Sequence, residues 1–375
     1  MHNNTLDKQL ISRRKILAGA GAALGAGLLP GSITNAQQVS ATRNANTAAS
    51  AQVLFTHTTV VTNDAQRRTL LDVALAVSDG VIQAIGNSDE LLAQFPNAEV
   101  IDGSRKALLP GLINCHAHLA ASLERGFNED FGFPNSLNLP VSPGSLISEE
   151  EATIMSVVAA LEGIRSGTTT MVQNTGGIAR DASALAETGL RWVFAESVRD
   201  IETVDGPMSP PRLAASVPPT FSDRLRVEGM QRIADLHSAW HGKQNGKISV
   251  FPAAALTELS SPQLLRDVRE FAERNDLGYT IHMTQSVAEV DFMLRYHGVR
   301  PALFLDQHDF LGPRLFAAHA RYCDVTEIAA LGRSKTIITH QAAMAANRGV
   351  NPPITALRAA GCTIANGTDN NNNDM

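Results

Sequence analysis

From Leu108 onward the sequence repeats one pattern, in which a short apolar segment is followed by a polar loop and an amphipathic helical segment. The segments with the composition of buried strands are 111–118, 168–174, 190–197, 248–254, 278–284, 315–320, 336–340 and 362–366. Parallel strands that are covered by helices appear in sequence as such apolar runs. Eight of them favour a closed (β/α)8 TIM barrel over an open doubly wound sheet. The pattern therefore predicts an α/β fold of the barrel class.

One connecting segment shows where its helix begins and ends. Ser148 is followed three residues later by Glu151, a capping-box pattern, and Gly167 stands where such a helix would stop. After the first apolar segment the chain lacks the glycine-rich sequence that binds the phosphates of a dinucleotide. Both features agree with a barrel and count against a dinucleotide-binding fold.

A different pattern precedes the barrel. From Gln52 to Lys106 short β-like segments alternate with turn residues, including Asp79 and Gly80 between two apolar runs. This pattern predicts a small β-unit. We therefore divide the chain into a leader with its linker at 1–51, the β-unit at 52–108 and the barrel at 109–375.

The first residues are similar to an export signal. Arg13 and Arg14 precede an apolar run rich in Ala and Gly, and small residues follow this run. The order is typical of a signal peptide, and the arginine pair resembles a twin-arginine signal, with cleavage after Ala36 or Ala51. The alternative is a membrane anchor, but the run contains Pro30 and is short and weakly apolar for a bilayer-spanning helix. We expect export to the periplasm by the twin-arginine machinery, with no stable membrane anchor.

Composition narrows the class of partner. The 375 residues are 44% hydrophobic and 18% charged, with a formal net charge of −6 and no long basic run. Nucleic acid is not an expected partner, because binding to its phosphates depends on clustered Lys and Arg. A globular protein that acts on a small-molecule substrate is the simpler expectation, and a homo-oligomer stays open. The three cysteines have no regular spacing and predict no disulfide framework.

Histidines gather where the predicted strands end. His116 and His118 end the first strand, and His282, His319 and His340 fall at the ends of the fifth, sixth and seventh strands. In a (β/α)8 barrel these carboxyl ends form one face, where active sites are built. Alternate residues of a strand point the same way, so the two histidines of the first strand can both face the barrel axis and bind one metal ion.

Asp369 lies just after the eighth predicted strand and completes this set. A single buried histidine is usually a satisfied core residue, and an aspartate in the sequence Gly-Thr-Asp is also typical of a turn. Five histidines and an aspartate that converge on one face of a barrel are harder to explain in that way. The sequence therefore predicts a metal centre.

Five segments in this order resemble the successive metal-binding and active-site motifs of the amidohydrolase superfamily: LLPGLINCHAHLAASLERG, YTIHMTQS, AAHARYCD, IITHQ and ANGTD. The resemblance is to the branch that contains cytosine, guanine and adenosylhomocysteine deaminases and triazine chlorohydrolases, and it extends over most of residues 52–375. It implies a barrel with a small β-sandwich assembled from both ends of the chain, of which 52–108 would be the N-terminal part. It also implies one divalent metal ion, with zinc preferred over iron.

The resemblance also implies roles for individual residues. The metal ligands would be His116, His118, His282 and Asp369. Asp369 would also act as general base on the attacking water, while His319 would lie beside this water and polarise the carbon under attack or stabilise the oxyanion. His340 would line the substrate pocket. Binuclear members need a bridging lysine at the end of the fourth strand, which the segment ISVFPAAALTE lacks, so we expect one metal ion.

Gln285 is the main departure from the family pattern. The deaminases have His-x-x-Glu after the fifth strand, where this chain has His282 followed by Met283, Thr284 and Gln285. That glutamate carries a proton to the ring nitrogen of the substrate, and an amide cannot titrate to do the same. We assign Gln285 to substrate orientation within the catalytic site. The expected reaction is hydrolysis of a non-peptide carbon–nitrogen bond in an amide, imine or similar group, rather than ring deamination.

Other positions also depart from the family. Ala254 and Ala255 replace a histidine near the end of the fourth strand, and Gln341 and Ala342 replace an Asn-Pro pair in the seventh-strand motif. Gln285 and the end of the barrel that we expect to be missing motivate a second hypothesis, a barrel that keeps its metal ion but is catalytically impaired. The retained histidines favour the hydrolase, because a structural metal site needs no open coordination position.

The end of the sequence suggests a fragment of a longer amidohydrolase. Asn370 to Met375 are all that follow Asp369, so we expect the helix after the eighth strand and the C-terminal half of the sandwich to be missing. An uncovered parallel strand would expose apolar surface and lower solubility. Composition does not name the substrate. Candidates to bind a substrate carboxylate are Arg125, Arg180 and Arg199, with solvated surface positions as the alternative.

Overall fold

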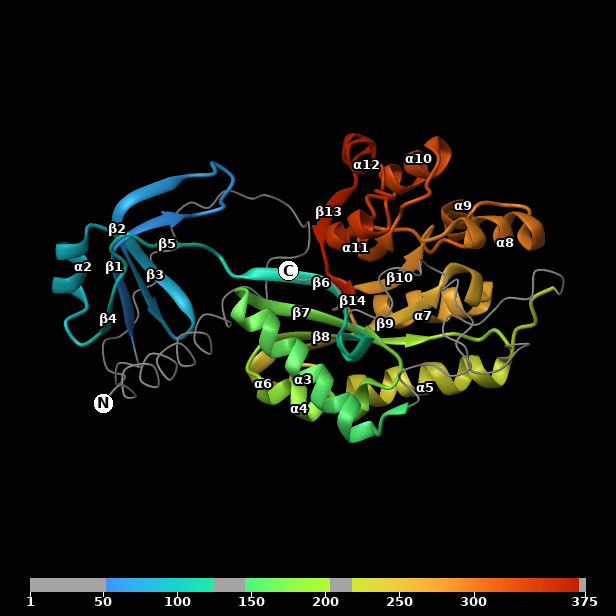
Figure 1. Cartoon of the computed structure of the whole chain (residues 1–375), viewed down its shortest axis with the longest axis horizontal. Helices are drawn as coiled ribbons and strands as arrows, with labels where there is room; N and C mark the ends of the chain where they lie inside the picture. Colours follow the sequence, from blue (N-terminus) through green and yellow to red (C-terminus); the bar gives the residue numbers. More distant parts are fainter. Residues whose placement is uncertain (1–51, 125–145, 203–217, 371–375) are drawn as a thin grey trace. The chain divides into compact units, whose positions relative to one another are not determined.

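The computed structural model describes residues 52–124, 146–202 and 218–370. The chain divides into two compact units, Met1–Gly111 and Leu112–Met375 (Figure 1). Among the described residues, no helix has the length and apolar character that a membrane crossing requires.

The first unit is a small sheet with one helix. Its elements are β1 (Val53–Val61), β2 (Thr69–Ser78), β3 (Val81–Gly86), α2 (Ser88–Gln94), β4 (Glu99–Asp102) and β5 (Ala107–Leu108). The sheet order is β3-β2-β1-β4, with β5 paired to β1. The turn expected at Asp79 and Gly80 joins β2 to β3, and both residues have positive φ, as the common two-residue hairpin loop requires. Leu54 and Leu91 are buried between the sheet and α2.

The second unit is a parallel sheet that closes into a barrel. Its strands are β6 (Leu112–His118), β7 (Thr168–Thr175), β8 (Arg191–Val198), β9 (Ile248–Leu256), β10 (Tyr279–Met283), β11 (Leu315–His319), β12 (Ile337–His340), β13 (Thr363–Asn366) and β14 (Asp369–Asn370). Each strand from β6 to β12 pairs with the next, and β14 pairs with β6, so the short segment from β13 to β14 connects the two edges of a nearly closed barrel. The eight apolar segments of the sequence correspond to β6–β13, and the predicted (β/α)8 fold is confirmed.

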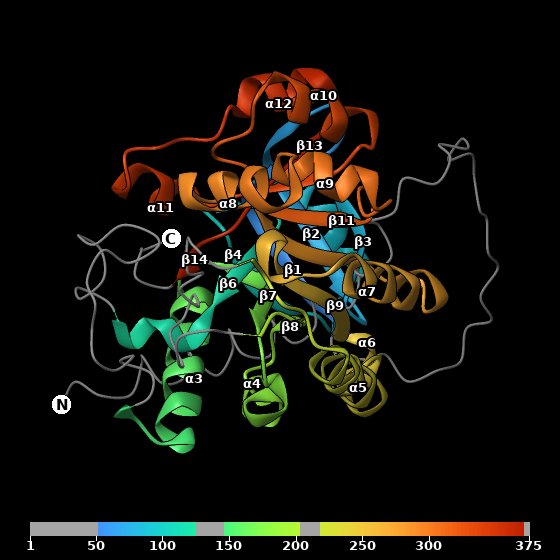
Figure 2. The same ribbon diagram turned by 90° about the vertical axis from the view of Figure 1, so that its right-hand side faces the viewer.

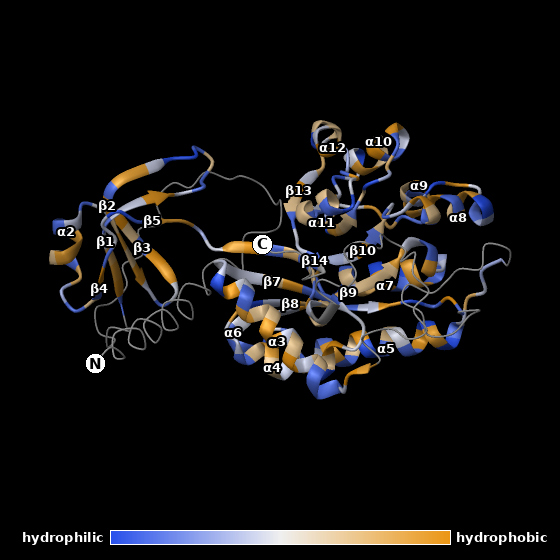
Figure 3. Ribbon diagram, in the orientation of Figure 1, coloured by the Kyte–Doolittle hydropathy of each residue, from blue (hydrophilic) through white to orange (hydrophobic). Residues whose placement is uncertain are grey.

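Helices surround the barrel strands (Figure 2). They are α3 (Glu149–Arg165), α4 (Ala182–Glu187), α5 (Asp223–Trp240), α6 (Lys243–Gly246), α7 (Pro262–Arg274), α8 (Val287–His297), α9 (Pro301–Gln307), α10 (Val325–Arg333), α11 (Ala342–Asn347) and α12 (Ile354–Ala360), with 3-10 turns η1 (Leu119–Glu124), η4 (Ile178–Arg180) and η5 (Thr257–Leu259). The predicted capping box begins α3, since the side chains of Ser148 and Glu151 each accept a hydrogen bond from the other's backbone N–H. Along α5, hydrophobic and hydrophilic residues alternate (Figure 3), and its buried residues include Gly229, Ile233 and Leu236, at helical spacing.

Two clusters of buried side chains hold the strands against these helices. One contains Trp192 and Phe194 of β8, packed with residues of α3 and α4. The other contains Ile281 of β10 and Ile338 of β12, packed with residues of α7 to α10. This close packing fixes the carboxyl ends of the strands, on which the predicted site residues lie.

Candidate metal centre and active site

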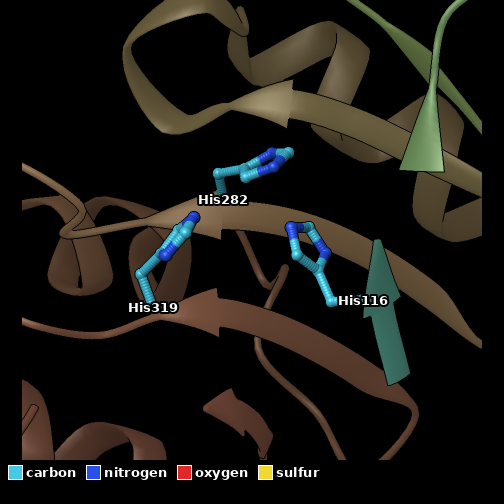
Figure 4. A group of neighbouring side chains, drawn as sticks. All are labelled: His116, His282 and His319. Carbon is cyan, nitrogen blue, oxygen red and sulfur yellow. The ribbon is translucent and has the colours of Figure 1, made fainter. Parts of the chain in front are cut away.

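Five of the predicted site residues come together at the carboxyl ends of the barrel strands. His116 and His118 are on β6, His282 is on β10, His319 ends β11 and Asp369 begins β14. The ligand atoms of His116, His282 and His319 lie within 4.8 Å of one another, and so do those of His116, His118 and Asp369. Figure 4 shows the three histidines of the first group, whose rings point toward a common centre.

Both histidines of β6 approach the same carboxylate oxygen. The Nε2 atom of His116 lies 3.6 Å from Asp369 Oδ1, and that of His118 lies 3.3 Å from the same atom. The strand register explains this geometry, because Asp369 pairs with Ala117, the residue between the two histidines. The His-x-His spacing therefore places two imidazoles beside one carboxylate.

Backbone carbonyl groups orient two of the imidazoles. Nδ1 of His118 donates a hydrogen bond to the carbonyl of Asn174, and Nδ1 of His282 donates to the carbonyl of Ala255 at 2.5 Å. A neutral imidazole that donates from Nδ1 has its lone pair on Nε2. The two Nε2 atoms are 3.1 Å apart. Two lone pairs therefore face each other, an arrangement that a shared cation would stabilise.

The separations between these atoms fit a bound divalent ion. Imidazole nitrogens bind zinc at about 2.0–2.1 Å, so two ligand atoms of a tetrahedral ion are about 3.3 Å apart. The distances of His118 Nε2 from His282 and from Asp369, 3.1 and 3.3 Å, are close to this value. Among the described residues, His116 Nε2 and both ring nitrogens of His319 are buried without a hydrogen-bond partner. Because buried polar atoms are rarely left unpaired, a ligand for them is expected.

Burial favours the neutral form of His116, His282 and His319. It lowers the pKa of His116, and it lowers the pKa of His282 and of His319 well below the ordinary value, with His116 and His118 adding to the effect on His282. Burial alone would raise the pKa of Asp369, but the imidazoles of His116 and His118 outweigh it and hold this pKa well below its ordinary value. The centre therefore offers neutral nitrogen donors and one carboxylate, the protonation states that bind metal ions.

Two residues of the centre have strained backbone conformations. His319 has a φ of 79° and Asp369 a φ of 65°, in the left-handed region that favours glycine. Such strain persists only where the surrounding structure enforces it, and it clusters at functional sites. Here it occurs where β11 ends and where β14 begins, and it accompanies the turning of both side chains toward the cluster.

Asn114 ties the Asp369 segment to β6, a role that the sequence analysis missed. Its Oδ1 atom accepts hydrogen bonds from the backbone N–H of Thr368 at 3.2 Å and of His116 at 3.3 Å. Its Nδ2 atom donates to Thr368 Oγ1 at 2.8 Å. One buried amide thus joins the residue before Asp369 to the strand that carries His116 and His118. The only signal in the sequence is a polar residue within an apolar strand.

Gln285 and His340 lie at the same end of the barrel but are not part of the converging ligand groups. Gln285 is 5% exposed, and its Oε1 atom has no hydrogen-bond partner among the described residues. Both polar groups of its backbone are hydrogen-bonded. The N–H donates to the Glu289 carboxylate at 2.6 Å, and the carbonyl accepts from the Arg321 guanidinium. His340 is partly buried at the end of β12, and its Nδ1 atom has no partner in the described part of the chain.

Three buried charged residues near the centre were also missed. Glu258 is in η5, Glu289 is in α8 and Arg321 follows β11, and all three are less than 8% exposed. Burial raises the pKa of Glu289 to about 7 and that of Glu258 well above its ordinary value. Their charge alone gives no signal in the sequence, since most Glu and Arg residues are exposed.

Comparison with known proteins agrees with the motifs and the fold. The sequence profile of the amidohydrolase family matches residues 107–375. A 5-methylthioadenosine/S-adenosylhomocysteine deaminase from Syntrophobacter fumaroxidans is 29% identical over 333 residues, which cover 87% of this chain and 71% of that protein.

Two solved structures share the fold. A triazine hydrolase from Arthrobacter aurescens matches with a TM-score of 0.75 and 22% identity, over 86% of this chain and 73% of that chain. An adenosine deaminase from Xanthomonas campestris, solved with bound zinc, matches with a TM-score of 0.71 and 23% identity, over 87% of this chain and 71% of that chain. At these identities the similarity shows the fold alone.

Proposed function

The chain belongs to the amidohydrolase family and is a hydrolase of that type, and from this premise we propose that it hydrolyses a non-peptide carbon–nitrogen bond of a small molecule with one divalent metal ion. The observation that carries the proposal is the 3.1 Å separation of the His118 and His282 Nε2 atoms. His116 and Asp369 place further ligand atoms beside them. The names of two similar proteins, a deaminase and a triazine hydrolase, support this class of reaction.

In this proposal His116, His118, His282 and Asp369 hold the ion, with zinc preferred over iron. When bound, such an ion acts as a Lewis acid and can lower the pKa of a water molecule to near 7. With four protein ligands, a water molecule would have to be the fifth ligand, a coordination number that catalytic zinc sites can reach. Strand β9 contains no lysine that could bridge a second ion, which supports one ion.

Asp369 and His319 are the residues that we assign to proton transfer and charge stabilisation. Asp369 is ionised because its pKa lies well below the ordinary value, so its carboxylate can take a proton from the attacking water. His319 is neutral, and its ring nitrogens have no hydrogen-bond partner among the described residues. Its ring N–H can therefore donate to the substrate oxygen that gains negative charge.

Gln285 and His340 are the residues that we assign to substrate binding. The Gln285 amide can donate and accept hydrogen bonds but cannot titrate, and its Oε1 atom is available to a substrate N–H. This supports hydrolysis of an amide, imine or similar group over ring deamination. The same glutamine also motivates a second candidate function, a metal-binding barrel with impaired catalysis.

Metal analysis of the purified protein is the first test. We expect about one zinc or iron ion per chain in the wild type and loss of the ion in His282→Ala, because a ligand is removed. The matched control is His297→Ala, which removes a histidine of α8 whose ring packs against Phe304, and it should keep the ion. Folded wild-type protein that binds no metal would contradict the proposal.

Hydrolysis assays then separate the two candidate functions. The panel contains amides, cyclic imides and aminated heterocycles, each incubated with the metal-loaded protein and with Asp369→Asn. Turnover that falls by about 100-fold or more in the variant supports the hydrolase. A metal-loaded protein that turns over no compound of the panel favours the impaired barrel. Gln285→Glu tests the substituted position, where gain of ring deamination is expected and unchanged activity would contradict its role.

We also propose that residues 1–51 direct export to the periplasm through the twin-arginine machinery. These residues lie outside the described part of the chain, so the support is the sequence, with Arg13 and Arg14 before an Ala- and Gly-rich run. Cell fractionation of the full chain should find the mature protein in the periplasm. Replacing both arginines with lysine should retain the precursor in the cytoplasm. The same distribution of the wild type and the lysine variant between periplasm and cytoplasm would contradict the proposal.

A further inference from the structure

A buried arginine lies beside the candidate metal centre without an acidic partner. Arg321 follows β11 two residues after His319, and it is 7% exposed. Its Nη2 atom donates to the backbone carbonyl of Gln285, and its Nη1 atom lies 3.7 Å from the sulfur of Met344. Its Nε atom is buried with no hydrogen-bond partner among the described residues. No acidic side chain in the described part of the chain forms an ion pair with it.

These contacts place the guanidinium among the loops that follow three neighbouring strands. Arg321 itself follows β11, Gln285 lies in the loop after β10, and Met344 is in α11, after β12. In a barrel this face carries the substrate-binding loops. Burial and the charge of Arg348 lower the pKa of Arg321, while Asp369 opposes this change. Two arginines and the Asp369 carboxylate are therefore close enough to interact.

The charges of Asp369 and Glu289 favour the ionised form of Arg321, but neither acid forms an ion pair with it in the described part of the chain. Glu289 accepts hydrogen bonds from the backbone N–H groups of Thr284 and Gln285, at 2.8 and 2.6 Å. Burial raises the pKa of Glu289 to about 7, and that of Glu258 well above its ordinary value, so neither carboxyl is fully ionised at neutral pH. A guanidinium stays charged, and a buried charge is unfavourable unless it is paired. An anion from outside the chain would provide that pair.

The arginines that the sequence suggested fit this role less well. Arg180 forms two hydrogen bonds with the carboxylate of the adjacent Asp181, at 2.6 and 2.8 Å. Arg199 is exposed to solvent. Arg125 lies outside the described residues. The buried position of Arg321, beside the metal centre, makes it the better candidate.

We propose that Arg321 binds a carboxylate group of the substrate, so that the substrates are small acids that also contain the carbon–nitrogen bond to be cleaved. A guanidinium has five N–H donors in a planar arrangement, and its described contacts leave donors that match the two oxygens of a carboxylate. Arg348 adds positive potential, and Gln285 can accept from a nearby N–H of the same molecule. The inference rests on the proposed function for the bond that is cleaved and adds the class of substrate.

A matched pair of probes tests this binding without catalysis. Benzoate carries a carboxylate, and benzamide is a neutral compound of nearly the same shape. We would titrate both into protein freed of metal by chelation, so that benzoate cannot bind an ion, and measure their affinities by calorimetry. The wild type should bind benzoate at least tenfold more tightly than benzamide, because only benzoate compensates the charge of Arg321.

Substitutions then identify the residue responsible. Arg321→Gln should abolish the preference for benzoate, and Arg321→Lys should retain part of it, because lysine keeps the charge but not the planar donor arrangement. The matched control is Arg191→Gln. Arg191 is 8% exposed but begins β8, at the amino end of the barrel strands, so its loss should leave the preference unchanged.

Three results with the wild type and Arg321→Gln would overturn the inference. These are equal affinity of the wild type for both probes, a benzoate preference that persists in Arg321→Gln, and tighter binding of phenyl phosphate than of benzoate, which would indicate a phosphate ligand. If Arg321→Gln does not fold, unchanged benzoate affinity in Arg321→Lys would also contradict the proposal. Because the assay needs neither metal nor turnover, its failure is distinguishable from failure of the hydrolase proposal. If the protein hydrolyses neutral compounds but does not bind benzoate, the hydrolase proposal holds and the proposal that Arg321 binds a substrate carboxylate is wrong.

Discussion

Gly367 lies so close to His116 that a Cβ atom added to it would be 2.8 Å from the His116 carbonyl oxygen and 2.9 Å from the His116 Cβ. Gly367 connects β13 to β14 and precedes Asp369 by two residues. The lack of a side chain therefore allows the last segment of the barrel to approach β6. This approach brings the Asp369 carboxylate to the histidines.

Replacing Gly367 with alanine should weaken metal binding. The added methyl group forces β14 and His116 apart, and such overpacking costs about 1–3 kcal/mol. Displacement of a ligand segment should lower metal affinity by about 10–100-fold. Competition with a chromophoric chelator measures this affinity. Gly86→Ala is the control, because a Cβ there would meet nothing within 4 Å. Wild-type affinity in the Gly367 variant would show that the close approach is not required.

Asn114→Ala should weaken both the fold and the metal site. The substitution removes the hydrogen bonds of the Asn114 amide to the N–H and the hydroxyl of Thr368, at about 1 kcal/mol each in the free energy of unfolding, while the Thr368 N–H still donates to the His116 carbonyl at 3.0 Å. Metal affinity should also fall by about tenfold or more, because Thr368 directly precedes the proposed ligand Asp369 and its displacement would move that carboxylate. Denaturant unfolding and metal competition measure the two effects.

The control for Asn114 is Asn275→Ala, which removes a hydrogen bond of 2.9 Å to the Phe271 carbonyl at the end of α7. This variant should lose stability but keep its metal affinity. If both variants lower metal affinity equally, the effect of Asn114 is general destabilisation, and the proposed role of its amide as a clamp is wrong.

Removal of the metal ion should lower the thermal midpoint of unfolding. An ion present at 1,000 times its dissociation constant stabilises the folded state by about 4 kcal/mol, which corresponds to a shift on the order of 10 °C. Differential scanning calorimetry with and without a chelator measures the shift. His282→Ala should show little response to the chelator. A wild type whose midpoint does not respond either would argue against a bound ion.

The barrel and the converging histidines could be predicted because their signals are local. Each buried strand is a short apolar run, and a histidine at its end lies on the functional face whatever the details of packing. His116 and His118 needed only the two-residue period of a strand. Asp369 could be placed because it follows the eighth run. Its assignment as a ligand, like those of the histidines, stays a prediction.

Residues that depend on tertiary contacts could not be found in this way. Asn114 and Thr368 are 254 positions apart, and their contact exists only because β14 pairs with β6. Arg321 and Glu258 are types of residue that are usually exposed, so their burial follows from the packing of the loops around them. The amide at Gln285 was visible in the sequence, but the carboxylate of Glu289 that holds its backbone was not.

Glu258 and Glu289 make the stability of the fold depend on pH. Burial raises the pKa of both, and the Oε2 atom of Glu258 has no hydrogen-bond partner among the described residues. The folded protein therefore binds more protons than the unfolded chain between the ordinary glutamate value of 4.5 and the raised value. Stability linked to these groups is present in full below pH 4.5 and is lost as the pH rises through this window.

Glu258→Gln should remove the part of the pH-dependent loss of stability that the ionisation of Glu258 causes. Glutamine has nearly the shape of protonated glutamate, so the variant and the wild type should have similar thermal midpoints at pH 5. At pH 8 the variant should be more stable by about 1–3 kcal/mol, the cost of a buried group without its partner. Thermal unfolding of the metal-free proteins at several pH values measures the difference.

The control is Glu270→Gln, on the exposed side of α7 beside Arg274, which should give a difference in stability from the wild type that does not change with pH. A constant difference for Glu258→Gln as well would mean that Glu258 titrates normally in the folded protein.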